Sequence, residues 1–187
     1  MSGATTPAPG RLDTVRRFVN TLDIDSATDA LTTPGELEDW LRSASLLAGA
    51  TSVGPDDLAR AVVVREALRS ALTANHGGDP IPAGALAVLN DAAARARLTA
   101  TLTARDGWRP RPAAGGVDGA LGGLLALVGD AMADGTWARL KICVNDTCQW
   151  AFYDESRARS GKWCSMQVCG NRAKQRAWRD RKAESTT

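Results

Sequence analysis

The chain has 187 residues, of which 44% are apolar and 24% are charged, a composition that is typical of a globular protein and argues against disorder along the whole length. The net charge of +2 hides an uneven distribution. Residues 139–182 carry eleven Lys and Arg against four Asp and Glu, a surplus of +7, which leaves −5 for the rest of the chain. An acidic body joined to a basic segment is typical of nucleic-acid-binding proteins, although such a segment can also serve solubility alone.

The amino-terminal residues 1–10 have neither the basic start nor the apolar run of a secretory signal, and their Pro, Gly, Ser and Thr content predicts a disordered lead-in. The longest apolar-rich stretch, residues 121–135, contains Asp130 and Asp134 and falls short of the roughly 20 apolar residues that a membrane span needs. We therefore expect no membrane association and a cytoplasmic, reducing location.

Two helices are predicted in the first fifty residues. The first is a short helix indicated by apolar residues at helical spacing, namely Leu12, Val15, Val19 and Leu22. The second begins at the capping box Thr33-Pro34-Gly35-Glu36, which has proline at the first helical position, and is expected to run to about residue 48 with Trp40 in the core. For Asn20 and Thr21, after the first helix, a cap or turn role and a place in a pocket are both open.

The pattern continues with helices over 55–74 and 82–97, whose inward residues are expected to be Leu58, Val62, Leu68 and Leu72 in the first, and Leu86, Leu89 and Ala93 in the second. His76, in the loop between them, is the only histidine, and we expect it to be solvated without a role. Residues 98–104 alternate with period two and predict a strand, which can be the first half of a hairpin ending near Trp108, followed by a loop over 109–116 and a helix over 117–133. The inward residues of this last helix are expected to be Leu121, Leu124, Leu125, Val128 and Met132.

All four cysteines follow, as Cys143-x4-Cys148-x15-Cys164-x4-Cys169. Two close pairs on short turns can place four thiolates in the tetrahedron that zinc prefers, which predicts one structural Zn²⁺ with no open coordination position. In a reducing compartment a disulfide pair is disfavoured, and a redox-active thiol site is the main alternative.

Helix geometry restricts the second cysteine pair. Five positions at about 100° each separate two side chains by roughly 140°, so Cys164 and Cys169 cannot both reach one metal from a continuous helix. The helix must begin between them, and Ser165 is a suitable N-cap. Residues 138–143 and 149–154 alternate as short strands around the first pair, so the order is strand, knuckle, strand, loop and helix, which is the order of a treble-clef finger.

The helix that follows Cys169 is a candidate DNA-reading element. At 100° per residue the amides of Asn171 and Gln175 share one side, where they can pair with adenine edges, while small residues including Ala173 and Ala177 are expected to lie against the knuckle. Candidate phosphate contacts are Arg172, Lys174, Arg176 and Arg179, together with Arg157 and Arg159 in the preceding loop. Alternatively, Arg172 with Lys141 and Lys162 neutralises the metal site, and Asn171 only caps a turn.

Specific motifs support this interpretation. Cys164-Ser165-Met166 and Val168-Cys169-Gly170-Asn171-Arg172, preceded by Phe152-Tyr153-Asp154 and Ser156-Arg157, closely resemble the CGNR zinc-finger family of bacterial proteins. FVNTLD (18–23) and the later helix with Trp40 resemble the ABATE domain that precedes that finger. The resemblance implies an α+β amino-terminal domain that binds an unidentified small ligand, a DNA-binding treble-clef finger, and a role as a stress-induced transcriptional regulator. It also implies metal ligation by Cys143, Cys148, Cys164 and Cys169.

We therefore predict an α+β protein with a mainly helical amino-terminal domain that has a small β element, followed by a treble-clef zinc finger. The expected limits are 1–10 for the lead-in, 11–136 for the ABATE-like domain, 137–183 for the finger and 184–187 for a tail. The predicted function is a DNA-binding transcriptional regulator, with a zinc-stabilised protein-docking adaptor as the alternative. We find no nucleophile–base pair, phosphate loop or clustered carboxylates, so we expect no enzyme. A homodimer, the ligand and the operator are left open.

Overall fold

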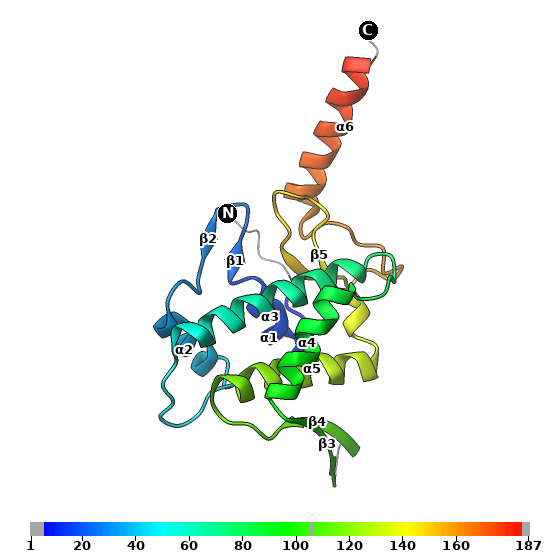
Figure 1. Cartoon of the computed structure of the whole chain (residues 1–187). Coiled ribbons are helices and arrows are strands. Elements are labelled where there is room, and N and C mark those ends of the chain that lie inside the picture. The colour runs from blue at the N-terminus through cyan, green and yellow to red at the C-terminus, as the bar shows by residue number, and fades with distance from the viewer. Residues whose placement is uncertain (1–5, 105–106, 185–187) are drawn as a thin grey trace.

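Five helices form the body of the protein in a computed structural model that describes residues 6–104 and 107–184 (Figure 1). They are α1 (Leu12–Val19), α2 (Pro34–Ser43), α3 (Pro55–Ala74), α4 (Ala83–Arg95) and α5 (Gly116–Asp134). α3 packs against each of the other four, and the buried side chains form one core that includes Phe18, Leu37, Leu68 and Leu124. The predicted mainly helical architecture with small β elements is confirmed.

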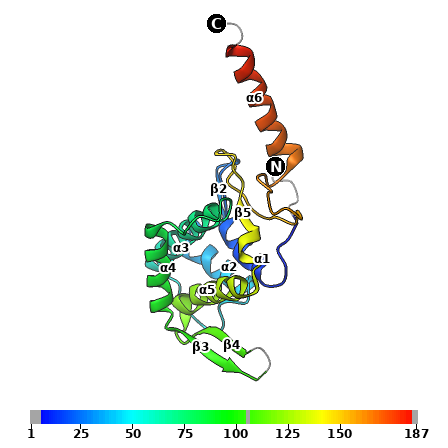
Figure 2. The same cartoon turned by 90° about the vertical axis from the view of Figure 1, so that its right-hand side faces the viewer.

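Three two-stranded antiparallel sheets accompany the helices in the described part of the chain. They are β1 (Leu22–Asp23) with β2 (Thr28–Asp29), β3 (Leu98–Thr103) with β4 (Gly107–Pro112), and β5 (Leu140–Ile142) with β6 (Ala151–Tyr153). The short helix η1 (Trp137–Arg139) leads into β5, and η2 (Met166–Gly170) leads into α6 (Asn171–Glu184). α6 and the β3–β4 hairpin project from opposite ends of the molecule (Figures 1 and 2).

Residues 1–5 of the expected lead-in and 185–187 of the expected tail lie outside the described residues. Within the rest of the lead-in, Ala8 is buried, and its N–H donates to Asp13 Oδ1 at 2.9 Å. The chain is thus tied to α1 before that helix begins. α1 ends at Val19, so Leu22, which was expected on the helix, lies in β1 instead.

The capping box at the start of α2 has the predicted geometry. Glu36 N–H donates to Thr33 Oγ1 (3.2 Å), and Thr33 N–H donates to Glu36 Oε2 (2.9 Å). α2 ends at Ser43, earlier than the sequence predicted, because Ser45 has a φ of +56° and the chain turns to bury Leu47. Trp40 is half-buried against the core, with its ring centroid 5.1 Å from that of Phe18.

α5 is long and apolar enough to cross a membrane, because it begins at Gly116 and so extends the apolar stretch that the sequence suggested was too short. More than half of this stretch is buried inside the protein, against α1, α3 and α4. That pattern is typical of a core helix in a soluble protein. Met132, expected to face inward, is 46% exposed, whereas Ala131 beside it is buried, so the inward face of the last turn of α5 is that of Ala131.

α4 uses small residues for its contact with the body. Ala85, Leu89 and Ala92 are buried, whereas Leu86, which we expected inside, is 45% exposed. The packing partner α5 presents Gly122 to Ala96, the residue that ends α4, where an added Cβ would lie 2.3 Å from the Cβ of Ala96. A glycine is therefore needed where the end of α4 approaches α5.

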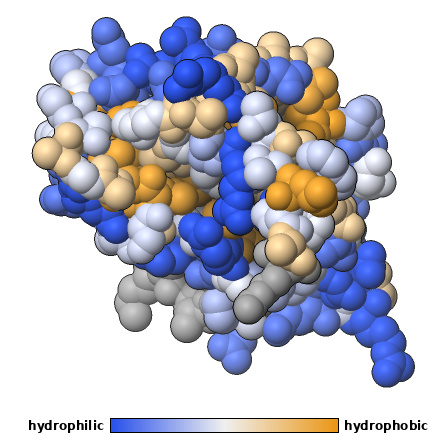
Figure 3. Space-filling model, turned by 90° about the horizontal axis from the view of Figure 1, so that it is seen from below, coloured by the Kyte–Doolittle hydropathy of each residue, from blue (hydrophilic) through white to orange (hydrophobic). Residues whose placement is uncertain are grey.

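The predicted strand at 98–104 is confirmed, but its partner β4 includes residues 109–112, which we expected to be a loop. Prolines are tolerated there because β4 is an edge strand. Period-two alternation does not bury one face of this hairpin, since it projects from the body, and the register pair Leu102 and Trp108 is exposed on both strands. Seen from the side that carries the hairpin, hydrophobic side chains form separate patches among hydrophilic ones (Figure 3).

β5 and β6 pack on the body, and side chains of the body satisfy their backbone groups. Asn20 Nδ2 donates to Ala151 O (2.9 Å), and Asn20 Oδ1 accepts from Ala151 N–H (2.7 Å), so one amide acts as a neighbouring strand for β6. Asn75 Nδ2 donates to Trp137 O and Leu140 O. His76 Nε2 donates to Ile142 O. The expectation that His76 is merely solvated is therefore wrong.

Replacing Asn20 tests this attachment. In Asn20→Ala the buried Ala151 N–H and C=O lose their partners, and the free energy of unfolding should fall by about 2 kcal/mol or more, since each unsatisfied group costs roughly 1–3 kcal/mol. Asn90→Ala, at an exposed position on α4, is the matched control and should change stability by less than about 0.5 kcal/mol. Urea unfolding measures both, and equal effects would contradict the proposed attachment.

Candidate metal centre and nucleic-acid interface

The first cysteine pair lies on a tight turn between β5 and β6, residues 143–148, which we call the knuckle. Cys143 N–H donates to Trp150 O (2.9 Å), and Cys148 N–H donates to Asn145 O (2.8 Å). Gln149 then takes a φ of +48°, which returns the chain into β6. β5 and β6 themselves match the two short strands that the sequence predicted on either side of this pair.

The second pair straddles the start of a helix, as predicted. Ser165 has an extended backbone, and its Oγ accepts from Val168 N–H (3.3 Å), so it is the N-cap of η2. Cys164 thereby lies in the preceding loop and Cys169 in the first helical turn. Val144 N–H donates to Lys162 O (3.0 Å), which holds this loop beside the knuckle.

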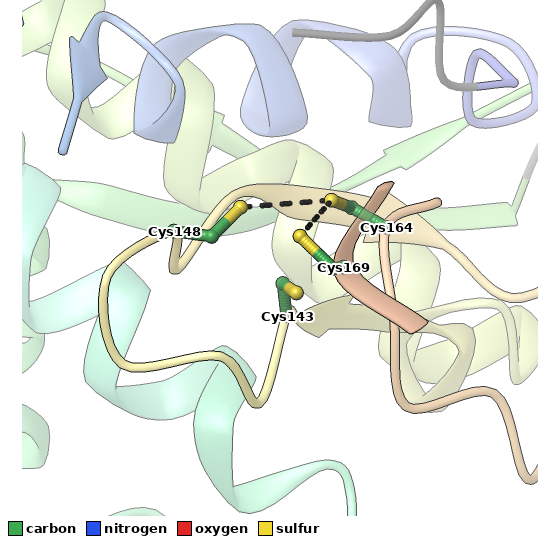
Figure 4. Close-up of side chains that lie close together, drawn as sticks. All are labelled: Cys143, Cys148, Cys164 and Cys169. Carbon is green, nitrogen blue, oxygen red and sulfur yellow. Dashed lines mark hydrogen bonds between the residues drawn. The ribbon is translucent and has the colours of Figure 1, made fainter. Parts of the chain in front are cut away.

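The four sulfur atoms lie within 4.8 Å of one another and converge on one point from three segments of the chain (Figure 4). Cys148 and Cys164 Sγ are 3.6 Å apart, and Cys164 and Cys169 Sγ are 3.7 Å apart. A tetrahedral zinc ion with Zn–S bonds of about 2.3 Å requires S–S distances of about 3.8 Å. Residue type, number and spacing therefore fit one Zn²⁺ held by four thiolates.

The protonation of these thiols also favours a cation. A hydrogen bond with Cys148 lowers the pKa of Cys143 to about 2, and the same bond raises the pKa of Cys148 to about 12. The pKa of Cys164 is raised as well, first of all by its hydrogen bond with Cys143. Without a cation a thiolate at Cys143 is thus favoured beside neutral thiols at Cys148 and Cys164, and a divalent ion in contact with the sulfurs is what stabilises further thiolates.

A buried ion pair supports the loop between the two pairs. Lys141 Nζ donates to Asp154 Oδ2 (2.9 Å) and to Arg159 O, while Asp154 accepts from the N–H groups of Ser156 (3.0 Å) and Gly161 (2.8 Å). Burial raises the pKa of Asp154, but these hydrogen bonds outweigh it and hold that pKa well below its usual range. Gly161 is required here, since an added Cβ would lie 2.7 Å from the Asp154 carboxylate. Lys141 therefore organises this loop.

The metal cluster is largely shielded from solvent. Cys143, Cys148 and Cys169 are buried, and Cys164 is partly buried. Trp150, Trp163 and Val168 pack around the sulfurs, and Asn145 Nδ2 lies 3.8 Å from Cys169 Sγ, in position to donate a hydrogen bond to it. An N–H group directed at a thiolate helps to orient a metal ligand. This enclosure indicates a structural site.

α6 leaves the body as a projecting helix (Figure 1). Among the described elements, its main contact is with η2, which directly precedes it. We expected a face of small residues to lie against the knuckle, and this is wrong: Ala173 is half-buried, but Ala177 and Met166 are exposed. The physical reason is that α6 projects from the body, so every residue from Lys174 to Arg179 is exposed whichever way it faces. Within η2, Gly170 N–H donates to Ser165 O (3.0 Å), five residues back.

The predicted DNA contacts lie on two neighbouring segments. Arg157 and Arg159 are exposed on the loop that Asp154 organises. The other predicted residues are all exposed on α6, namely Asn171, Arg172, Lys174, Gln175, Arg176 and Arg179. Two of these six have intramolecular partners: Asn171 Nδ2 donates to Gln167 O (2.9 Å), and Arg172 Nη1 donates to Asp25 Oδ1 (2.8 Å).

Asp25 was missed in the sequence analysis. It lies in the turn between β1 and β2, 147 residues before Arg172, and joins the amino-terminal part of the chain to the start of α6. Both side chains of this pair are substantially exposed, at 30% for Asp25 and 47% for Arg172. Nothing in the local pattern of residues 22–29 indicates a partner so far along the chain, and the approach of the β1–β2 hairpin to α6 had to be seen in the structure.

Removal of the metal provides a direct test of the cluster. One zinc per chain is expected in the purified protein, and Cys169→Ser should lose most of this zinc. The control Ser165→Ala should keep the metal and lower the free energy of unfolding by only about 1 kcal/mol, since it removes the N-cap hydrogen bond alone. Elemental analysis gives the metal content, and circular dichroism after chelation should show loss of η2 and α6 while the five helices of the body remain. Wild-type zinc affinity in Cys169→Ser would contradict four-thiolate ligation.

Two protein-family models match the sequence. The model named ABATE, described as "Putative stress-induced transcription regulator", matches residues 12–135, and the CGNR zinc-finger model matches residues 139–182. No curated protein matches the sequence. The resemblance inferred from the motifs is confirmed, and both families are regulatory or zinc-finger families rather than families of enzymes. Because the first match spans well over half of the chain, the protein belongs to the ABATE family, and it carries a CGNR zinc finger whose four cysteines bind zinc.

Proposed function

We propose that the protein is a DNA-binding transcriptional regulator without enzymatic activity, whose zinc finger contacts DNA and whose amino-terminal domain binds a controlling small ligand. The observation that carries the proposal is α6: a projecting helix with six Lys and Arg against Asp180 and Glu184, a net charge of +4. Lys174, Arg176 and Arg179 are exposed and make no hydrogen bond or ion pair with other described residues. Such cations are available for phosphate groups.

The dimensions of α6 suit the major groove. Its 14 residues extend about 21 Å at 1.5 Å per residue, and the groove admits an α-helix. Gln175 has an exposed amide without a hydrogen-bond partner among the described residues and is the stronger candidate for base contact. Asn171 keeps only its Oδ1 and one amide hydrogen for DNA, since Nδ2 already donates to Gln167 O. Arg157 and Arg159 add two cations on the loop of the finger that precedes η2, where they would contact a phosphate group of the DNA.

A second function is favoured by one observation. Trp178 on α6 is 57% exposed, with Lys182 Nζ 5.3 Å from its ring centroid. Exposed tryptophan is common at protein interfaces, so a zinc-stabilised adaptor that docks a polypeptide partner is the alternative. The adaptor would retain a protein partner but no DNA at low salt. The charge of α6 supports the DNA-binding function more strongly.

Selection from a random DNA pool tests the proposal most directly. Zinc-loaded protein should enrich a sequence motif, and the enrichment should vanish after chelation, since the metal holds η2 and α6 on the knuckle. Absence of any enriched motif, together with capture of a polypeptide partner, would favour the adaptor. Homodimer formation on DNA would show as two half-sites in the selected motif.

Substitutions on α6 should separate two kinds of DNA contact. Arg179→Ala should lower the affinity for cognate and random DNA about equally. Gln175→Ala and Asn171→Ala should instead reduce the difference in affinity between cognate and random DNA. With about six phosphates neutralised, affinity should also fall roughly 10³-fold between 50 and 200 mM salt. Fluorescence anisotropy measures these effects. An affinity for DNA that does not change with salt would contradict the proposed phosphate contacts. Identical losses of affinity and specificity in all three variants would contradict the assignment of Arg179 to phosphate and of Gln175 and Asn171 to bases.

Asp25 should compete with DNA for Arg172. An exposed ion pair contributes about 0.2–1 kcal/mol, so Asp25→Asn should strengthen DNA binding by roughly 1.5- to 5-fold. The matched control is Asp39→Asn, which makes the same change in net charge at an exposed position on α2. Titration of both variants with one DNA duplex distinguishes the local effect from the global one. An equal gain in the control would show that Asp25 acts only through net charge.

A further inference from the structure

A groove of about 290 Å³ lies where the carboxyl end of α1, α2 and the end of the knuckle region meet. Its walls include Arg16, Arg17 and Asn20 from the first part of the chain, Trp40 from α2, and Trp150 from just before β6. The volume is close to the lower end of the roughly 300–1,000 Å³ range that is usual for small-molecule sites. The FVNTLD motif thus lines a groove and also performs structural tasks.

Most polar groups in the groove already have partners. Both ends of the Asn20 amide are bonded to Ala151. Thr21 Oγ1 donates to Phe18 O and accepts from Arg65 Nη1, and Arg16 Nε is bonded to Asp13 at 2.6 Å. These side chains shape the groove but have little remaining capacity to recognise a ligand.

Two hydrogen-bond donors remain. Arg17 is exposed and makes no hydrogen bond or ion pair with other described residues. Trp150 Nε1 is buried and has no acceptor among the described residues, which leaves a donor whose unsatisfied burial costs about 1–3 kcal/mol. Among the described residues that line the groove, none carries a carboxylate. The unpaired polar side-chain groups of these lining residues are donors, and they favour a ligand with a negative charge and at least two acceptor atoms.

The apolar part of the groove favours a planar ligand. Trp40 and Trp150 both line it, and Trp40 is fixed by its contact with Phe18. Indole surfaces bind flat rings well, and the small volume limits the occupant to one or two rings. Trp150 also packs against the cysteine cluster, so an occupant of the groove would touch the body and the finger at once.

We infer that this groove binds a small aromatic carboxylate, with Arg17 paired to the carboxylate, the Trp150 indole turned so that its N–H donates to the same group, and the ring of the ligand against the two indoles. The inference deepens the ligand-control part of the proposed function by assigning it a site and a chemical class. An occupant that contacts both parts of the chain stabilises their present arrangement, and by linkage its affinity depends on that arrangement.

Calorimetry on the zinc-loaded full chain, without DNA, tests the inference with benzoate and indole-3-carboxylate as probes, and with benzamide and inorganic phosphate as comparisons. At least one aromatic carboxylate should bind ten-fold or more tightly than benzamide and phosphate. Arg17→Gln should raise its Kd about ten-fold and Trp150→Phe several-fold. The matched controls Arg111→Gln and Trp108→Phe, at exposed positions on β4, should leave it unchanged.

Several results would overturn the inference. If benzamide binds as tightly as benzoate, the negative charge of the ligand is not recognised. If inorganic phosphate binds as tightly as benzoate, the aromatic ring is not recognised. No saturation by either carboxylate below about 10 mM, or no effect of Arg17→Gln on the Kd, also rejects the site. Arg17 is exposed, so its variant should fold even if Trp150→Phe does not. A chain that binds the carboxylate but no DNA would support the groove and contradict the regulator.

Discussion

The structure depends on the polar attachment of β5 and β6 to the helical body. A two-stranded sheet leaves both of its edges without backbone partners, and buried N–H and C=O groups must find them elsewhere. Here side chains of the body supply them: Asn20 for β6, and Asn75 and His76 for β5 and the turn before it. Arg69 adds hydrogen bonds to Val19 O and Gln149 O. The strands also share the apolar core, through Leu140, Ile142 and Ala151. The start of the finger is therefore fixed to the amino-terminal domain.

The zinc ligands extend this attachment to the part of the finger that the body does not touch extensively. Cys143 directly follows β5 and is placed by the attached sheet, whereas Cys164 and Cys169 lie on a loop and a helical turn with few other anchors. Those anchors include the hydrogen bond from Val144 to Lys162, the bond from Gly161 N–H to Asp154, and the ion pair between Asp25 and Arg172. Zinc bonds are much stronger than either contact, so the metal sets the position of η2 and, through it, the direction of α6.

Features that depend on local chemistry could be predicted from the sequence. The capping box at Thr33, the N-cap at Ser165 and the convergence of two cysteine pairs rest on residues a few positions apart, and all three occur in the structure. Features that depend on distant neighbours could not. Leu86 is exposed because the face of α4 that packs on the body is formed by Ala85, Leu89 and Ala92, and His76 has a role because β5 lies beside its loop. The spacing of apolar residues along the sequence does not reveal contacts with such distant neighbours. The β3–β4 hairpin occurs, but its second strand continues past Trp108 to Pro112, because the two prolines that suggested a loop are compatible with an edge strand.

The helical projection of the finger shows how one local irregularity changes the reading of a surface. A uniform 100° step placed Met166 and Cys169 on the same side as Ala173 and Ala177, which predicted a helix lying against the knuckle. The five-residue hydrogen bond in η2 gives each residue there less than the 100° of rotation assumed, so a uniform step applies only from Asn171 onward. Cys169 faces the other three sulfur atoms, whereas Ala177 is exposed because α6 projects from the body. Because none of the described residues of α6 beyond its first turn is buried, its cations and amides are accessible along most of its length.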